Sequence, residues 1–355
     1  MAPLTRLRAD KHHVPAPMMQ EYYTQRASVP GTLLIAEATL ISPTHAGVPH
    51  APGIWTEAQI EGWRKITNAI HAKGCRMICQ LVAPGRAADV ETLKQDGGGD
   101  MLCSSAMAMP GEGFAPKDGP TPTPREMGEE DIQACISDFV QAAKNVMAAG
   151  FDGVEIHGAN GYLIDQFTQD TCNQRSDRWG GSIENRCRFA VEIAKAVAAA
   201  IGAQHVGFRV SPWSEFQGMR MADPVPTFSY LATQLKSLGI GYLHIIEGRV
   251  NNNVDIESAD SIDFLLKIWD NSTPVLIAGG NTPSNILEAA DRKYKGWDVI
   301  FVFGRHFLAN PDLPFRLRHG IELNKYDRST FYAAESAKGY ADYPFSDDYL
   351  LKHQK

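Results

Sequence analysis

Short runs of β-branched and aliphatic residues alternate along this chain with longer segments whose apolar residues recur at helical spacing. This alternation is the strongest constraint on the fold, because neighbouring parallel strands need a crossover, usually a helix, between them. Glycine follows most of the helical segments and supplies the left-handed turn that a helix C-terminus favours. We predict strands at residues 32–37, 76–81, 153–157, 205–210, 242–246, 274–278 and 298–303, and helices at 57–72, 129–149, 182–200, 226–238, 261–269 and 284–293.

An eighth strand is half visible, because Met1-Ala2-Pro3 resembles the C-terminal end of a strand that runs into a loop. Eight strand–helix units in one domain favour an α/β fold of the TIM (β/α)₈ barrel type, for which about 250 residues are typical. An open doubly wound sheet is the alternative, but no G-x-G-x-x-G motif opens a helix after any strand. We expect a single domain over residues 1–355, with an excursion at 82–126 and a C-terminal extension at 310–355.

Composition argues against several function classes. The net charge is −7 and basic residues are interspersed with acidic ones, so no basic stripe is available for nucleic acid. No apolar run reaches the roughly 18 residues of a membrane span, and the N-terminus lacks an apolar signal core, so we expect a soluble cytoplasmic protein. The 6 cysteines lack the spacing of a zinc site, so we expect reduced thiols and no bound metal.

Polar residues follow many of the predicted strands, at the face where the active site of a TIM barrel lies. So many polar side chains at one face would be an unusual coincidence in a purely structural barrel. The residues at these strand ends are Thr5, Glu37, Gln80, His157, Arg209 and Glu247, followed later in the chain by Gly279-Gly280 and Gly304-Arg305.

The sharpest cluster is the turn after the strand at 153–157. His157 and Asn160 could both donate hydrogen bonds to one oxygen atom, and Tyr162 adds a phenol that can give up a proton. Gly158 and Gly161 allow the chain to turn sharply here. A histidine and an asparagine at a strand end could also merely cap a turn, but the added tyrosine favours a catalytic interpretation.

Two glycine-bearing turns, Gly279-Gly280 and Gly304-Arg305, follow the last two strands. The corresponding loops of TIM barrels form a phosphate site, where backbone N–H groups hold the anion and an arginine can add a bidentate contact. Most glycine pairs are ordinary turns, but two such turns at the two expected strands predict a phosphate site.

Arg209 lies at the end of the strand predicted at 205–210, which is the fifth when the half-visible N-terminal strand is counted. A partly buried cation there needs an anionic partner. That partner could be a barrel carboxylate such as Glu155, or the negative charge of a reduced flavin. Together with Gln80 and Thr5, the phosphate turns suit a flat cofactor that carries one phosphate, and FMN fits. A sugar phosphate would also fit, but aldolases and isomerases would want a strand-end lysine or paired carboxylates, and no predicted strand ends in lysine.

Over nearly its whole length the chain resembles the old yellow enzyme family of FMN-dependent NADPH dehydrogenases and ene-reductases. Residues 28–34 and His157-Gly158-Ala159-Asn160 are most similar to fungal members, including chanoclavine-I aldehyde reductase-like enzymes of alkaloid metabolism. The motifs that carry the resemblance are MAPLTR at 1–6, APGIW at 51–55, HGANGY at 157–162, WGGSIENR at 179–186, Gly304-Arg305, NPDL at 310–313 and KYDR at 325–328.

The resemblance implies a role for each matching position. The flavin ring would lie against Pro3, Leu4, Thr5, Ala38, Gln80 and Arg209, and its phosphate would be held by Gly279, Gly280, Gly304 and Arg305. The substrate oxygen would be bound by His157 and Asn160, with Tyr162 as proton donor. The substrate pocket would be walled by Phe216, Tyr332 and Val254.

The implied activity is a ping-pong reaction, in which NADPH and an α,β-unsaturated aldehyde, ketone or nitroalkene use the same pocket in turn. The implied partners are these small molecules alone, with the protein a monomer or a homodimer. Family members with Leu-Trp after the glutamine close the pocket with that tryptophan; Leu81-Val82 replaces the pair here, so we expect a wider cavity. Where members have a serine after the histidine, this chain has Gly158, to which we assign a structural role.

Family members also carry about twenty residues before the Met1-Ala2-Pro3 motif, forming a short hairpin and most of the first barrel strand. We therefore expect a truncated first strand with exposed edges beside it. The alternative function that follows is a flavin-binding protein with little or no turnover.

Overall fold

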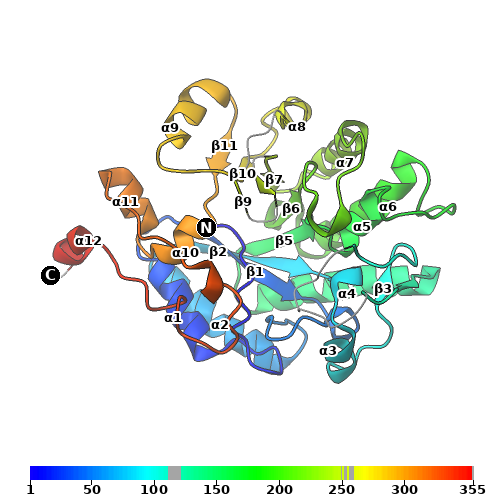
Figure 1. The fold of residues 1–355 in the computed structure, drawn as a ribbon, viewed down its shortest axis with the longest axis horizontal. Coiled ribbons are helices and arrows are strands. Elements are labelled where there is room, and N and C mark those ends of the chain that lie inside the picture. Colours follow the sequence, from blue (N-terminus) through cyan, green and yellow to red (C-terminus); the bar gives the residue numbers. More distant parts are fainter. Residues whose placement is uncertain (111–120, 249, 252–253, 256–259, 354–355) are drawn as a thin grey trace.

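A 7-stranded parallel sheet curls around the centre of the molecule, with helices outside it (Figure 1). The structure is a computed structural model that describes residues 1–110, 121–248, 250–251, 254–255 and 260–353. Strand order follows chain order and every neighbouring pair is parallel, as successive crossovers of one hand produce. The strands are β1 Leu33–Leu40, β2 Arg76–Val82, β5 Gly153–Gly158, β6 Val206–Val210, β7 Tyr242–Ile246, β10 Val275–Ala278 and β11 Val299–Phe301.

The first two residues of the chain bridge the two edges of this sheet. On one side, the Met1 amino group donates to Leu33 O at 2.7 Å, and Ile35 N donates to Met1 O at 3.0 Å. On the other side, Ala2 N donates to Phe303 O at 2.9 Å, just beyond β11. The N-terminus accordingly lies between β11 and β1 in Figure 1. Met1 and Ala2 thus occupy the place of the half-visible eighth strand, and the predicted TIM barrel architecture is confirmed.

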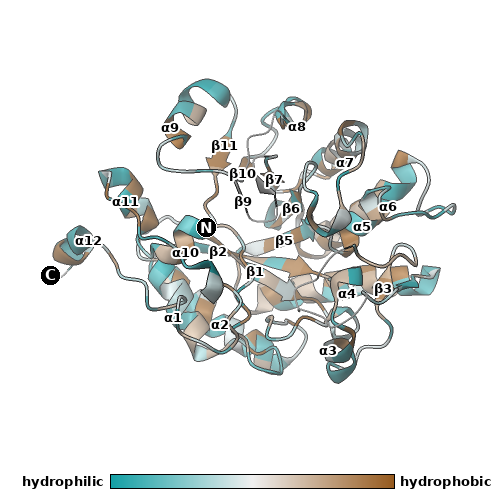
Figure 2. Ribbon diagram, viewed as in Figure 1, coloured by the Kyte–Doolittle hydropathy of each residue, from teal (hydrophilic) through white to brown (hydrophobic). Residues whose placement is uncertain are grey.

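Amphipathic helices cover the outside of the barrel. Three of the longest bury an aromatic side chain completely: Trp63 on α2, Phe139 on α4 and Phe189 on α6. Strands are mostly brown in Figure 2, whereas teal residues gather on the helices. The helices are α1 Pro17–Arg26, α2 Glu57–His71, α3 Val90–Gln95, α4 Glu129–Ala148, α5 Leu163–Thr168, α6 Ile183–Ile201, α7 Val225–Ser237, α8 Asp263–Trp269, α9 Ile286–Glu288, α10 Arg305–Ala309, α11 Leu313–His319 and α12 Asp347–His353.

Every predicted strand and helix is present; the strand at 242–246 has the predicted ends, and the ends of the others are shifted. The largest difference lies at 284–293, where α9 is a single turn that continues as the π-helical segment Ala289–Lys293. The last predicted strand is also shorter than expected, since β11 comprises only Val299–Phe301. Short helices such as α1, α3 and α5 were not predicted.

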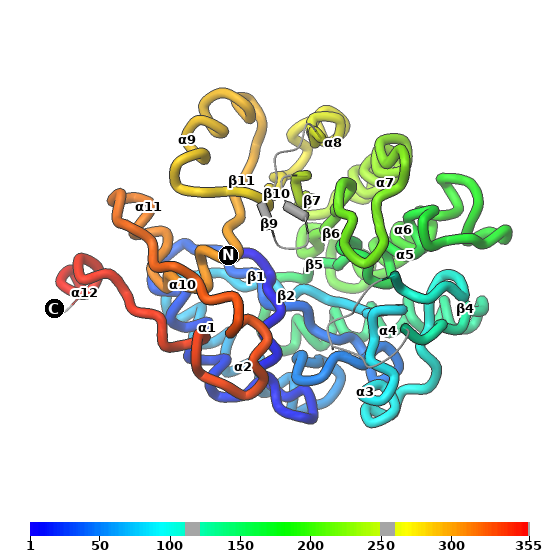
Figure 3. Tube along the Cα trace, viewed as in Figure 1, coloured from blue at the N-terminus to red at the C-terminus, as the bar shows by residue number. Residues whose placement is uncertain are grey.

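Two segments extend beyond the barrel strands, the excursion at 82–126 and the C-terminal segment. The excursion forms a small sheet from β3 Leu102–Cys103 and β4 Arg125–Glu126. A second small sheet joins β8 Val250–Asn251 and β9 Val254–Asp255. The C-terminal segment, orange to red in Figure 3, runs beside the blue N-terminal part of the chain and ends in α12 at the periphery. Within the residues that the structure covers, no helix has the length and apolar character needed to cross a membrane.

Candidate active site

One cavity of about 220 Å³ opens at the C-terminal ends of the barrel strands. A single water molecule needs only ~10–15 Å³, so this cavity can admit an organic ligand. Its walls come from the chain start, from the loops after the strands and from the C-terminal segment. The lining residues that the sequence predicted are Pro3, Leu4, Thr5, Gln80, His157, Asn160, Tyr162, Arg209, Phe216, Gly279, Gly280, Gly304, Arg305 and Tyr332.

Ala38 lines a smaller, separate cavity of about 10 Å³, which it shares with Thr5, Val82 and Tyr162. This cavity has room for about one water molecule. It lies beside Val82, where the sequence predicts a wider pocket. The side chain of Val254 falls outside the part of the chain that the structure describes.

The turn after β5 presents His157, Asn160 and Tyr162 to the main cavity. Asn160 and Gly161 both adopt left-handed backbone conformations, with φ of 58° and 75°, and Asn160 N donates to Ser211 Oγ at 2.8 Å. The rings of His157 and Tyr162 lie 5.0 Å apart between centroids. The two rings are therefore neighbours, and all three residues face the same cavity.

Burial sets the protonation states in this group. Burial, together with the nearby charge of Arg209, lowers the pKa of His157 to about 3, so its ring is neutral at physiological pH. The buried His157 Nδ1 atom has no hydrogen-bond partner within the described structure. Burial also raises the pKa of Tyr162 above its ordinary value, with a contribution from Tyr332. The phenol therefore stays protonated.

Glu155 lies behind the cavity at the centre of a buried polar cluster. Its carboxylate accepts hydrogen bonds from Gln80 Nε2 at 2.7 Å, Tyr242 OH at 3.0 Å and His244 Nδ1 at 2.8 Å. Burial opposes ionisation, but His244 and Arg209 outweigh it and lower the pKa of Glu155 to about 2. The cluster therefore holds a negative charge that fixes the orientation of the Gln80 amide.

Arg209 lies between this charge and the cavity. Burial lowers the pKa of its guanidinium, while Glu155 raises it. Its Nε atom is buried and without a hydrogen-bond partner in the described structure. The electrostatic link to Glu155 was anticipated from the sequence, whereas Tyr242 and His244 were missed. Their two-residue spacing, which places both on one face of β7, was the signal that could have found them.

The two glycine turns also line the main cavity. Gly279 and Gly280 have φ of 105° and 64°, a region that favours glycine. Asn281 Nδ2 donates to Ile277 O at 2.8 Å and to Val302 O at 3.1 Å, which ties β10 to the segment after β11. Asn281 was not predicted, although it directly follows the glycine pair.

Arg305 follows the second of these turns. Its Nη1 atom donates to Tyr326 OH at 3.4 Å, and its guanidinium lies 5.7 Å from the Tyr326 ring centroid. Three buried polar atoms that line or flank the cavity, His157 Nδ1, Arg209 Nε and Asn281 Oδ1, have no partner in the described structure. Buried polar groups are normally satisfied, so these three atoms have hydrogen-bonding capacity to offer a polar ligand in the cavity.

Two buried arginines that the sequence analysis missed hold Tyr332 at the cavity. Arg6 Nε and Arg8 Nη1 both donate to Phe331 O, at 3.1 and 2.8 Å. Arg6 Nη2 also donates to Gly339 O at 2.7 Å. The C-terminal segment is thereby fastened to the residues that immediately follow Thr5.

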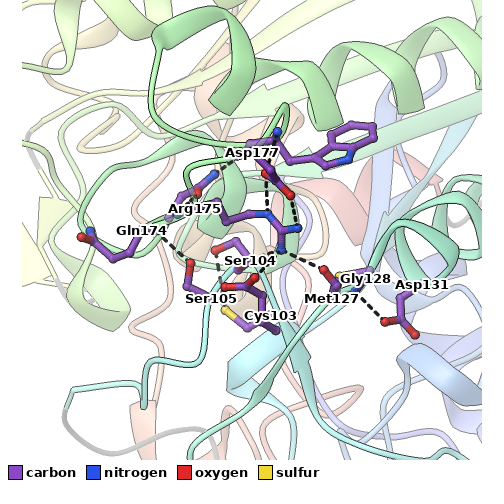
Figure 4. A network of polar contacts seen from close by, with 12 residues as sticks. Cys103, Ser104, Ser105, Met127, Gly128, Asp131, Gln174, Arg175 and Asp177 are labelled. Atoms are coloured by element: carbon purple, nitrogen blue, oxygen red, sulfur yellow. Dashed lines mark hydrogen bonds and ion pairs between the residues drawn. The ribbon is translucent and has the colours of Figure 1, made fainter.

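Arg175 fastens the excursion to the loop that follows α5 (Figure 4). Its Nη1 atom donates to Ser104 O at 3.0 Å and to Met127 O at 2.8 Å, and its Nη2 atom pairs with Asp177 at 2.5 Å. Beside this network, the buried thiols of Cys103 and Cys172 lie 3.6 Å apart. All 6 cysteines are free, as expected.

Sequence comparison shows the family to which the chain is similar. The profile of the family described as NADH:flavin oxidoreductase / NADH oxidase matches residues 1–324. A chanoclavine-I aldehyde reductase of Penicillium roqueforti is 51% identical over 349 residues, which cover 98% of this chain and 92% of that protein. A probable inactive reductase of Epichloe festucae var. lolii is 47% identical over 367 residues, which cover 100% of this chain and 93% of that protein.

Solved structures agree over the whole barrel. An old yellow enzyme homologue from Zymomonas mobilis superposes with a TM-score of 0.89 at 37% identity, covering 97% of this chain and 94% of that one. A morphinone reductase variant in complex with tetrahydroNAD superposes with a TM-score of 0.85 at 37% identity, covering 98% and 93%.

Proposed function

The chain belongs to the NADH:flavin oxidoreductase / NADH oxidase family, which makes it an FMN-dependent oxidoreductase that uses a nicotinamide cofactor, and on this premise we propose that it is an ene-reductase. It takes electrons from NADPH and saturates the carbon–carbon double bond of α,β-unsaturated aldehydes, ketones or nitroalkenes. The observation that carries the proposal is the placement of His157, Asn160 and Tyr162. These residues line the same cavity as Arg209 and the two glycine turns.

The residues that line the cavity offer the hydrogen-bonding groups and positive charges that FMN needs. The glycine turns and Arg305 would hold the phosphate, and Arg209 would offer a positive charge to the ring. Gln80 commits its Nε2 to Glu155 and would offer its oxygen as an acceptor. When bound, FMN supplies the hydride chemistry. The residues of the main cavity that would line it are Pro3, Leu4, Thr5, Gln80, Arg209, Gly279, Gly280, Gly304 and Arg305. Ala38 lies instead in the smaller cavity, which shares Thr5 and Tyr162 with the main one.

The protein's own contribution is to bind the substrate oxygen and to supply a proton. His157 and Asn160 donate hydrogen bonds to the carbonyl or nitro oxygen, where negative charge builds up during the reaction. A neutral imidazole suits this task, because it keeps one N–H donor without competing for the proton. Tyr162 holds a proton that it delivers to the α carbon. Phe216 and Tyr332 wall the pocket on either side of the substrate.

The similarity to a chanoclavine-I aldehyde reductase supports an alkaloid-derived enal as the substrate. We infer that NADPH and the substrate use this cavity in turn, since both must reach the same cofactor. The assembly that we propose is a monomer or a homodimer that acts in the cytoplasm.

The direct test is the colour of the purified protein after loading with FMN. Under nitrogen, NADPH should bleach the yellow flavin and a subsequent enone should restore it, with one equivalent of saturated product. A parallel sample without enone must stay bleached. A flavin that NADPH bleaches but that no enal, enone or nitroalkene reoxidises contradicts the proposed activity.

The second candidate function is a flavin-binding protein with little turnover. The similarity to a probable inactive reductase favours this candidate. The same experiment separates the two candidates, because a protein that binds FMN but is not bleached by NADPH is a binder.

A further inference from the structure

The turn that carries Asn160 and Tyr162 packs directly against the loop that carries Phe216. A Cβ atom on Gly161 would lie 2.7 Å from Gln217 Cβ and 3.1 Å from Met219 Cγ, so turn and loop meet without a gap. Both segments contain backbone that other parts of the structure must hold in place. In the loop, Gln217 and Arg220 have φ of 58° and 70°, which is unusual for residues other than glycine.

A buried carboxylate on α5 links these two segments through hydrogen bonds. Asp165 Oδ2 accepts from Gly161 N, and Asp165 Oδ1 accepts from Gln169 Nε2, both at 2.8 Å. Gln169 Oε1 in turn accepts from Arg220 N at 2.8 Å. Asp165 and Gln169 are both fully buried, so water does not compete for these bonds. The route runs from the turn through two side chains to the loop.

We propose that Asp165 is a positioning residue, whose carboxylate and its partner Gln169 hold the turn and the loop in one arrangement around the substrate. This inference rests on the proposed function, in which Asn160 and Tyr162 act on a substrate walled by Phe216. Its geometric basis is independent of any cofactor. A small misplacement of a proton donor can slow a reaction ~10²-fold, so a buried link of this kind matters for rate.

The link depends on the charge of Asp165. Both carboxylate oxygens accept hydrogen bonds, so a proton on either oxygen would displace one donor. Burial raises the pKa of Asp165 to about 7, while Gln169, Gly161 and Arg86 oppose the rise. The elements packed around α5 carry these titratable or charged side chains: Arg86, Cys103, Glu155, His157, Glu184, Arg186, Cys187, Arg188, Glu192 and Lys195. Of these, Arg86 is the one whose charge acts on the pKa of Asp165.

The thiol of Cys103 could also produce a pH dependence near neutrality, because its pKa is about 7, like that of Asp165. Burial raises this pKa, and its hydrogen bond with Cys172 and the charge of Arg86 are among the causes that lower it. The Cys103 thiol donates to Gln166 Oε1 at 3.2 Å, and Gln166 Nε2 donates to Gly161 O at 2.7 Å. A Cys103→Ser variant therefore distinguishes the two titrations: the pH inflection described below should persist in it.

The test compares Asp165→Asn with Asp170→Asn, an exposed carboxylate five positions further along the chain. In the FMN-loaded protein at pH 8, single-turnover enone reduction should fall about tenfold to a hundredfold in Asp165→Asn. It should remain at the wild-type rate in Asp170→Asn. Reduction by NADPH should slow less, because that step takes no proton from Tyr162. The unfolding temperature should not fall.

The pH profile gives a readout that a purely structural role would not change. In the wild-type protein, enone reduction should increase as pH rises through about 7 and the carboxylate forms. In Asp165→Asn this inflection should be absent. A wild-type rate and inflection in Asp165→Asn overturn the proposal. Equal slowing of both half-reactions with a lower unfolding temperature also overturns it.

A second variant and a non-reducible ligand keep this test separate from that of the proposed function. Gln169→Met breaks the link to Arg220 but leaves the bond between Asp165 and Gly161. It should weaken binding of cyclohexanone, a saturated carbonyl compound, measured by calorimetry on the FMN-loaded protein. If the wild type reduces no enone, the proposed function fails, yet weaker cyclohexanone binding in both variants still supports the link. Unchanged binding in both variants overturns it.

Discussion

At the scale of single residues, Tyr162 has a protonated phenol at physiological pH, because burial raises its pKa. We expect Tyr162→Phe to slow enone reduction about 10²–10⁴-fold, the usual contribution of a general acid. Reduction of the flavin by NADPH should be nearly unchanged, since that step needs no proton from this residue. Stopped-flow measurement of each half-reaction checks this, with Tyr230→Phe on α7 as the matched control. Equal slowing of both steps would remove Tyr162 from the acid role.

Arg305 should affect the binding of FMN rather than the reduction of the enone. We expect Arg305→Ala to purify with much less FMN, because this side chain lines the cavity beside the glycine turns. Enone selectivity of the remaining holoenzyme should be nearly constant. The ratio of flavin to protein is the measurement, and Arg328→Ala is the control, since Arg328 contacts the same Tyr326 ring at 5.5 Å. Full flavin content in Arg305→Ala would show that the phosphate lies elsewhere.

At the scale of elements, the barrel could be predicted from the sequence because each strand is a short apolar run bounded by a glycine or a polar residue. Helix α5 could not, because all its residues are buried and it therefore lacks the polar face that helical periodicity reveals. Asp165 and Gln169 look like surface residues in such a segment. Their role depends on contacts with Gly161 and Arg220 that only the folded chain creates.

The search for polar residues at strand ends identified most of the residues that line the cavity, but not the residues that hold this lining in place. Arg6 and Arg8 bind carbonyl groups more than 320 residues away, which no local pattern anticipates. Glu37, by contrast, was noted as a strand-end polar residue. It turns out to accept from Arg6 N at 3.0 Å and from Tyr23 OH at 3.3 Å, and it supports the wall of the site.

The excursion offers a prediction about stability at this scale. Arg175→Ala would leave the carbonyl groups of Ser104 and Met127 without their donor. We expect a loss of about 2–3 kcal/mol in the free energy of unfolding, the typical cost of unsatisfied buried groups. Urea unfolding measures the loss. Arg178→Ala is the control, because Arg178 stacks on Trp179, at 4.9 Å, and Arg175 is the donor to both carbonyl groups. A change equal to that of the control would show that this anchor is dispensable.

At the scale of the whole molecule, stability should depend on pH through Glu37. Burial raises its folded-state pKa from 4.5 to about 7, so the folded protein holds the proton more tightly than the unfolded chain. This contribution is fully present below about pH 4.5 and is lost as pH rises through 7. Glu37→Gln should therefore be more stable than wild type at pH 8, by at most about 3 kcal/mol.

Urea unfolding at pH 5 and pH 8 checks this prediction. Glu21→Gln, an exposed carboxylate on α1, is the control and should follow the wild-type profile. If Glu37→Gln and wild type lose stability equally between the two pH values, the proton is not held at Glu37.

The bonds from Arg6 and Arg8 to Phe331 and Gly339 also have a consequence for the order of events during synthesis. A ribosome makes the chain from the N-terminus, and residues that line the cavity come from both its first and its last parts. While residues near 330 are still inside the exit tunnel, Tyr332 is missing from the cavity and both arginines lack their C-terminal acceptors. The wall that Tyr332 supplies is therefore the last part of this cavity lining to be synthesised, after every residue proposed to hold FMN.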